Sequence, residues 1–370
     1  MIEIKQVLKK EIPDVLQNPE YWNGSFLPVS KHRLYAHYKN PTCDDDDVVL
    51  LLGYLNDELV GYMGVFIDKI KLDGHEQKIG WLSTWWVHPK TKGTGIGRKI
   101  LNTMYGVQGG KIGISQFTPS AKRVYDKSGY FVTLKESKGI KGVLRSNLSF
   151  VIPIVLPKLS KFRGLLVKAD HFFDVFVNVK ISLQRFGVRK RVNSCQLEYL
   201  NILDPEAIDL IEKYGKSHIS PKGAAFFEWL KAYHWVQDAP LLSNTQKDKY
   251  AFSMVDRSFS VYLIKVIKQN KPIGFIVLQK RHRTMKVLFA YYDQGQYSKE
   301  LADIVKLHCI DQNIREVICY DPGICFQIQR SWLFLYKTKK NKQSIISKTF
   351  GKTNFDDVFM NFGDGDCSFA

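Results

Sequence analysis

Short apolar runs separated by polar turns dominate the first third of the chain. Residues 48–54 and 59–66 are two such runs with an Asn-Asp turn between them, so this stretch predicts a β-hairpin. A third run, at 81–87, predicts a strand that must end at His88 and Pro89, because proline has no N–H to donate to a sheet. The other elements expected before residue 130 are strands at 2–7 and 111–116 and helices at 12–17, 29–38, 98–105 and 120–127.

The same order of elements returns in the second half of the chain. Residues 56–66 read NDELVGYMGVF and residues 269–279 read QNKPIGFIVLQ, with Gly61 and Gly274 in equivalent places. This match predicts two copies of one mixed α/β unit. The elements expected in the second copy are strands at 197–203, 261–267, 273–278, 285–291 and 316–320 and helices at 205–213, 224–233 and 298–309.

A basic segment separates the two copies. The domains expected at 1–150 and 193–370 leave an inter-domain arm at 151–192, and residues 157–191 of it carry nine Lys or Arg and two acidic residues. Apolar and polar residues alternate over 173–183, which is a strand signature, although the flanking residues also fit a helix. Either this arm has a solvated basic face, or it provides a surface for acidic lipid or for a long anionic substrate.

Composition narrows the class of protein. The chain has 370 residues, 45% hydrophobic and 24% charged, with a formal net charge of +18. These values indicate a folded, two-domain protein that attracts anions such as nucleic acid, an acidic membrane or a phosphorylated ligand. Six scattered cysteines without a CxxC pair speak against a disulfide framework or a zinc site. No signal-peptide core or membrane-length apolar run is present, so we expect a cytoplasmic protein without metal.

A glycine-rich loop between a predicted strand and a predicted helix carries the clearest chemistry. Residues 85–97 read WWVHPKTKGTGIG, and a helix is expected to start directly afterwards. The first N–H groups of a helix lack partners, and the helix dipole favours negative charge there, so the loop predicts a pyrophosphate site. Its spacing fits neither the P-loop nor the dinucleotide-binding fingerprint. Positive charge around the loop comes from Lys90, Lys92, Arg98 and Lys99.

With its context, this loop resembles motif A of the GNAT superfamily of acyl-CoA N-acyltransferases, in which [RQ]-x-x-G-x-[GA] follows a strand that ends near V-x-P. Lysine stands here where the family usually has Arg or Gln. Residues 120–130 look like the family's A-x-x-x-Y-x-x-x-G-[FY] helix, and the resemblance is clear over about residues 48–135. The matching positions are Lys92, Gly93, Thr94, Gly95, Ile96 and Gly97 in the first motif and Ala121, Tyr125, Gly129 and Tyr130 in the second.

The resemblance implies a fold and a donor substrate. It implies a mixed α/β (α+β) chain of two tandem GNAT-like domains, each with a central, mostly antiparallel twisted sheet flanked by helices. Acetyl-CoA, the expected acyl donor, would lie between the strands at 81–87 and 111–116 and would be attacked directly by a primary amine. The expected cofactor-binding residues are Trp85, Val87, Lys92, Gly93, Thr94, Gly95, Ile96, Gly97 and Arg98.

The same resemblance assigns catalytic candidates. Tyr125 matches the family's general acid for the departing thiolate, and a phenol is suited to this task because it stays protonated at neutral pH. The base is less defined. His88 is the one titratable side chain in 81–89, although a histidine before this proline is also an ordinary loop residue. Asp68 and Glu76 are further candidates.

The second copy departs from the motif. Where the loop should be, it has a single glycine, Gly295, and Asp293, whose charge would repel pyrophosphate. We therefore expect only the first copy to bind acyl-CoA and the second to shape the acceptor site or an interface.

The class of acceptor is inferred by analogy. The closing stretch at 361–369 (NFGDGDCSF) makes the chain similar to GNAT-like proteins encoded with bacterial surface-polysaccharide genes, which implies an amino-sugar or sugar-nucleotide acceptor. Two alternatives stay open. One is a tRNA-dependent aminoacyltransferase of the peptidoglycan type, although so complete a CoA loop speaks against nucleic acid. The other is a non-catalytic acyl-CoA-binding or scaffold protein. Oligomeric state and membrane contact through the arm also stay open.

Overall fold

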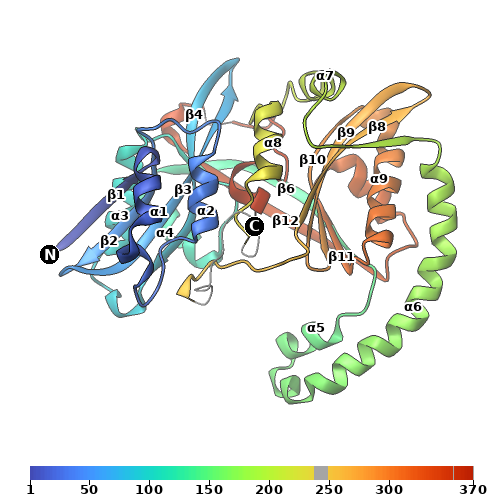
Figure 1. The fold of residues 1–370 in the computed structure, drawn as a ribbon, viewed down its shortest axis with the longest axis horizontal. Coiled ribbons are helices and arrows are strands. Elements are labelled where there is room, and N and C mark those ends of the chain that lie inside the picture. The colour runs from blue at the N-terminus through green and yellow to red at the C-terminus, as the bar shows by residue number, and fades with distance from the viewer. Residues whose placement is uncertain (237–248, 353, 370) are drawn as a thin grey trace.

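One twelve-stranded sheet runs through the protein (Figure 1). The computed structural model describes residues 1–236, 249–352 and 354–369. The strands lie in the order β1-β2-β3-β4-β5-β12-β6-β11-β10-β9-β8-β7. They are β1 (Ile2–Leu8), β2 (Val48–Leu55), β3 (Glu58–Leu72), β4 (His75–Val87), β5 (Ile112–Ile114), β6 (Phe131–Val143), β7 (Gln196–Leu200), β8 (Ser260–Lys268), β9 (Lys271–Arg281), β10 (Thr284–Tyr292), β11 (Glu316–Cys319) and β12 (Tyr336–Ser347).

The two halves of this sheet repeat one arrangement. Read inward from either edge, β1 to β5 and β7 to β11 come in the same order, and only β4–β5 and β10–β11 pair in parallel. The last strand of each half crosses over, because β12 pairs with β5 and β6 pairs with β11. The crossed strands β6 and β12 also pair with each other, so they close the middle of the sheet.

Helices cover the sheet, and most begin as the sequence predicts. Pro stands at the start of α4 and α7 and is preceded by a capping side chain, Thr118 and Asp204 respectively. The helices are α1 (Ile12–Gln17), α2 (Lys31–Tyr38), α3 (Ile96–Val107), α4 (Pro119–Ser128), α5 (Leu148–Val155), α6 (Arg163–Val192), α7 (Pro205–Tyr214), α8 (Ala224–Ala232), α9 (Gln294–Asp311) and α10 (Pro322–Gln329).

The strand expected over 173–183 is wrong, because the whole stretch belongs to the 30-residue helix α6. Two apolar stripes run along opposite sides of this helix. Val177 and Ile181 face the protein body, whereas Val175 and Val179 face outward. Each stripe recurs every three or four residues, and the two interleaved stripes imitate the two-residue period of a strand.

The C-terminal segment returns to the middle of the molecule (Figure 1). The short helix η7 (Gly365–Phe369) packs on β3 and β4 of the first half. Upstream of it, the Asn361 amide contacts Nδ1 of His218 at 2.9 Å, and the His218 ring stacks on Phe359. A neutral imidazole suits this site, because burial lowers the pKa of His218 to about 4.

The buried His218 predicts how the stability of the protein depends on pH where the C-terminal segment packs on it. The unfolded chain takes up a proton near pH 6.5 that folded His218 excludes, so this group's contribution to stability is lost as the pH falls from 6.5 to 4. Between pH 7 and pH 5 the loss amounts to about 2 kcal/mol. Buried Asp364, whose pKa is raised to about 7, acts in the opposite sense. Thermal unfolding of wild type and His218→Gln at pH 7 and pH 5 tests this. We expect the variant to lose less stability than wild type between the two pH values. Parallel pH curves for the two proteins would contradict this.

Candidate active site

A wedge opens in the sheet where β4 and β5 part. The two strands pair only at Gly80–Ile112 and Trp81–Gly113, so the rest of β4 has no ladder partner on β5. A register shift between β3 and β4 lies close to this point, and Thr84 there has φ +52°. Such a bulge re-aims the backbone of a strand. Beyond Trp81, the edge of β4 that faces β5 therefore makes no ladder hydrogen bonds to that strand.

The glycine-rich loop leads from the end of β4 into α3. Gly93 and Gly95 have φ of +89° and +80°, and a Cβ at either position would meet nothing within 4 Å. The positive φ, rather than crowding, is what requires glycine there. Gly95 is also the N-cap of α3 and brings no capping side chain. The start of the helix is therefore open to an anion.

A cavity of about 880 Å³ lies over this helix start. Its walls come from the end of β4, the loop, the first turns of α3 and the last turn of α4. Of the nine predicted cofactor-binding residues, the cavity brings together all but Thr94, whose hydroxyl donates to the carbonyl of Thr91 at 2.8 Å. The eight that line it are Trp85, Val87, Lys92, Gly93, Gly95, Ile96, Gly97 and Arg98.

Three exposed cations on the cavity wall form no ion pair within the described part of the chain: Lys92, Arg98 and Lys127. Lys127, from the last turn of α4, was missed by sequence reasoning. Two of the predicted cations are engaged elsewhere, because Lys90 pairs with Glu58 and Lys99 donates to the carbonyl of Ile2 at 2.6 Å.

Tyr125 lies behind the cavity rather than in its wall. The side chain is 4% exposed, and its ring packs 5.6 Å from that of Trp85, which does line the cavity. Burial, together with the charge of Asp366, raises the pKa of Tyr125. The phenol therefore stays protonated at neutral pH.

The candidates for the base occupy different settings. Nδ1 of His88 accepts from the Lys90 N–H at 3.1 Å, so this nitrogen helps to form the turn, although the residue also lines the cavity. Asp68 is buried against Lys222 at 2.7 Å and accepts further hydrogen bonds from Trp81 and Ser220. Its oxygens are committed to holding the two halves together. Glu76 lies at the hairpin end of β4, on the far side of Trp81 from the wedge.

A carboxylate that sequence reasoning did not single out stands in the wedge itself. Oδ2 of half-buried Asp366 accepts from the Ser83 hydroxyl at 2.5 Å, and Oδ1 accepts from the Ser115 hydroxyl. Ser83 lies on β4, and Ser115 directly follows β5, so Asp366 bridges the two strands where they part. Buried Arg33, on α2, donates to the Ser83 oxygen at 2.5 Å. The signal for this residue lay in the acidic DGD of the closing stretch.

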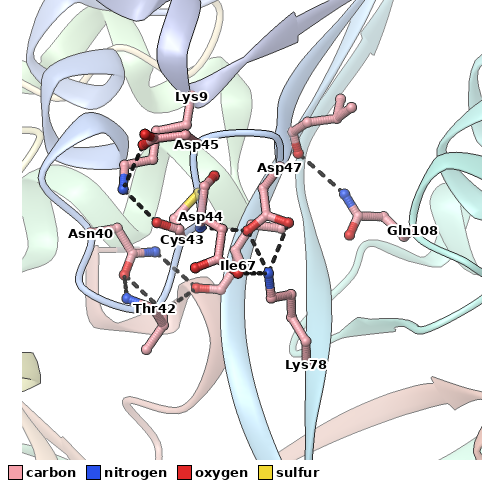
Figure 2. A network of polar contacts seen from close by, with 11 residues as sticks. Lys9, Asn40, Thr42, Cys43, Asp44, Asp45, Asp47, Ile67, Lys78 and Gln108 are labelled. Atoms are coloured by element: carbon pink, nitrogen blue, oxygen red, sulfur yellow. Dashed lines mark hydrogen bonds and ion pairs between the residues drawn. The ribbon is translucent and has the colours of Figure 1, made fainter.

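The acidic turn before β2 is occupied by lysines rather than available to a ligand (Figure 2). Lys78 on β4 contacts Asp44 at 2.5 Å and Asp47 at 2.9 Å, and Lys10 pairs with Asp46 at 2.7 Å. These pairs fasten the turn to β4 and to the end of β1. Within the described residues, no group of three or more His, Cys, Asp or Glu is placed to hold a metal ion.

Comparison with known proteins gives the class of the fold. Residues 3–133 match the family model of the acetyltransferase (GNAT) domain. The yeast Saccharomyces cerevisiae N-myristoyltransferase with bound myristoyl-CoA is a structural relative, with a TM-score of 0.50, 9% identity, and coverage of 93% of this chain and 82% of that one. Residues 3–133 therefore resemble a GNAT domain, and the chain as a whole shares a mixed α/β fold with the yeast enzyme, in which helices flank a large, twisted, mostly antiparallel sheet.

Two further solved structures are similar at a lower score. A GCN5-related N-acetyltransferase from Anabaena variabilis has a TM-score of 0.49 and 9% identity, over 94% of this chain and 72% of that one. A probable N-acyltransferase from Enterococcus faecalis has a TM-score of 0.49 and 8% identity, with the same coverage of 94% and 72%. A search of curated proteins returned no match to this chain.

Proposed function

We propose that the protein is an acyl-CoA-dependent N-acyltransferase that moves an acetyl group from acetyl-CoA to a primary amine. The observation that carries the proposal is the 880 Å³ cavity at the uncapped start of α3, beside the wedge in the sheet. The helix start would bind the phosphates of the donor, and the adjoining wedge would receive its thioester.

Each part of the donor has a matching part of the cavity. The pyrophosphate would lie on the first turn of α3, where backbone N–H groups and the helix dipole favour negative charge. Lys92, Arg98 and Lys127 would neutralise its phosphates. The pantetheine arm would follow Trp85 and Val87 along β4, which leads the thioester into the wedge.

Two groups next to the cavity, Asp366 in the wedge and Tyr125 behind the cavity wall, would divide the proton transfers. Asp366 would take a proton from the acceptor amine as its nitrogen attacks the thioester carbonyl, because a carboxylate that accepts two hydrogen bonds still has free lone pairs. The carbon–sulfur bond then breaks, and Tyr125 would protonate the departing thiolate. The products are an acetamide and free CoA. His88 remains a second candidate for the base.

The wider assignment extends the resemblance noted from the sequence. The repeated strand order of the two half-sheets supports a tandem arrangement of GNAT-like units at 1–150 and 193–370, with 151–192 as the connecting arm. The second unit would bind no acyl-CoA, because Asp293 caps the start of α9 with its own carboxylate at 2.9 Å from the Gly295 N–H. The proposed acceptor class is an amino sugar or a sugar nucleotide.

An acceptor screen tests this function. The protein is incubated with acetyl-CoA and a panel of amino sugars, sugar nucleotides, amino acids and polyamines, and products are read by mass spectrometry alongside thiol release. An acetylated amine formed together with CoA supports the proposal. Binding of acetyl-CoA without thiol release from any member of the panel would favour a non-catalytic acyl-CoA-binding protein instead.

Tyr125→Phe should separate catalysis from binding. We expect kcat to fall about 100-fold, the low end of general-acid effects, because the thiolate loses its proton donor. The dissociation constant of acetyl-CoA should stay within about twofold, because the hydroxyl lies behind the cavity wall. Tyr105→Phe is the matched control, since it also removes one hydroxyl, the one bonded to Thr349. An unchanged kcat for Tyr125→Phe would remove this residue from the mechanism.

A further inference from the structure

The arm formed by α5 and α6 extends from the body of the molecule (Figure 1). The C-terminal end of α6 is fixed to the body by two ion pairs, Arg191–Asp303 and Arg185–Asp311, both at 2.7 Å. At its other end, Asp170 accepts hydrogen bonds from the backbone N–H groups at the start of α5. These contacts determine which side of α6 turns outward.

The outward side of α6 is a continuous apolar stripe. Its residues recur at spacings of three, four or seven, so they lie on one face of a helix about 45 Å long. The end of α5 adds Ile154 and Val155, which are 65% and 68% exposed. The stripe, here termed the arm face, consists of Leu165, Phe172, Phe176, Val179, Leu183 and Phe186, with exposed fractions between 58% and 78%.

Basic residues border the arm face, and acidic residues are absent from it. The two acids of α6, Asp170 and Asp174, are turned inward to the N–H groups of residues 146–149. None of the bordering cations forms an ion pair with any described residue. They are Lys168, Lys180, Arg189 and Lys190 on α6 and Lys158, Lys161 and Arg163 just before or at its start.

We propose that the arm face binds the surface of an anionic lipid bilayer, with α6 lying in the plane of the headgroups. Apolar side chains that include phenylalanine would enter the headgroup–acyl boundary, while flanking Lys and Arg reach lipid phosphates. No helix among the described residues is long and apolar enough to cross a membrane. The site is independent of the proposed acetyl transfer.

Charge favours a bilayer over a second copy of the chain. A two-fold contact between two arm faces would bring the basic borders of the copies together with no carboxylate to offset them. A bilayer with acidic lipids supplies both an apolar layer and negative charge. The arm face therefore matches an anionic lipid surface in both respects.

Vesicle sedimentation with the full-length protein tests this. We expect binding to phosphatidylcholine vesicles that contain 30% phosphatidylglycerol, weaker binding in 0.5 M salt, and little binding to phosphatidylcholine alone. Equal binding to both vesicle types would overturn the role of the basic border, and no binding to either would overturn the proposal.

Two pairs of variants separate charge from apolar area. Lys180→Ser with Lys190→Ser should weaken vesicle binding on the order of 25-fold, about fivefold per cation, whereas Lys213→Ser with Lys216→Ser on the α7 side should not. Phe176→Ser with Leu183→Ser should weaken binding at least tenfold, whereas Ile202→Ser, also exposed, should not.

The oligomeric state of the protein tests the alternative that the arm face binds a second copy of the chain. Light scattering after size-exclusion chromatography should give a monomer mass for wild type and for all four variants. A wild-type dimer that Phe176→Ser with Leu183→Ser dissociates would assign the arm face to a second copy and overturn the lipid proposal. An unchanged unfolding midpoint and circular-dichroism spectrum for every variant exclude loss of the fold as the cause.

Discussion

Gly95→Asp should weaken acetyl-CoA binding at least about 100-fold without unfolding the protein. The new carboxylate would stand at the uncapped start of α3, where the pyrophosphate is expected, so two negative charges would compete for the same N–H groups. The left-handed backbone at φ +80° adds strain of about 1 kcal/mol, which lowers stability only modestly. Isothermal titration calorimetry with acetyl-CoA measures the loss.

A second glycine provides a closely matched control for this strain. Gly74, in the hairpin between β3 and β4, has φ +84° and, like Gly95, open space where a Cβ would stand. Gly74→Asp therefore introduces the same side chain and the same backbone strain away from the cavity. Equal loss of binding in both variants would show that strain alone is responsible, and retained binding in Gly95→Asp would remove the pyrophosphate from this loop.

The sequence correctly predicted the features that depend on residues close together in the chain. The hairpin of β2 and β3, the end of β4 before Pro89 and the loop with Gly93 and Gly95 each depend on residues within a few positions of one another. Positive φ at a glycine and a missing proline N–H act at that range. The same short stretch predicted the helix α3, which begins at Ile96, two residues before the expected position 98.

What the sequence left out depends on contacts between distant segments. The strands β6 and β12 were not predicted, because both partners of each strand come from the other half of the chain. Asp366 was missed for the same reason, since its partner Ser83 lies 283 positions earlier. The acidic DGD around Asp366 is visible in the sequence, but no local pattern shows that this carboxylate reaches β4 and the end of β5.

The strand predicted over 173–183 was wrong for a different reason. The inner and outer apolar stripes of α6 are each helical, but their sum has the period of a strand. A periodicity argument assumes one buried face, and a helix with one face on the protein and a second apolar face exposed violates that assumption. Such a violation is itself informative, because the second stripe is what the lipid proposal explains.

Asp366→Ala gives the sharpest test of the proposed proton transfer. We expect kcat to fall about 1,000-fold, within the range of general-base effects, because the amine loses its proton acceptor. Acetyl-CoA binding should be unchanged, since Asp366 does not line the cavity. The unfolding midpoint should fall, because the Ser83 and Ser115 hydroxyls lose their acceptor at about 1–3 kcal/mol.

Rescue distinguishes a base from a structural bridge between β4 and β5. Formate fits the space of the missing carboxylate and can accept a proton, so it should restore part of kcat in Asp366→Ala in a concentration-dependent way. In Asp366→Asn the amide occupies that space and keeps a bridge to the two serines, so formate should have no effect although the fold is retained. If Asp366→Asn kept wild-type kcat, the carboxylate would be a bridge only, and His88 would become the remaining candidate for the base.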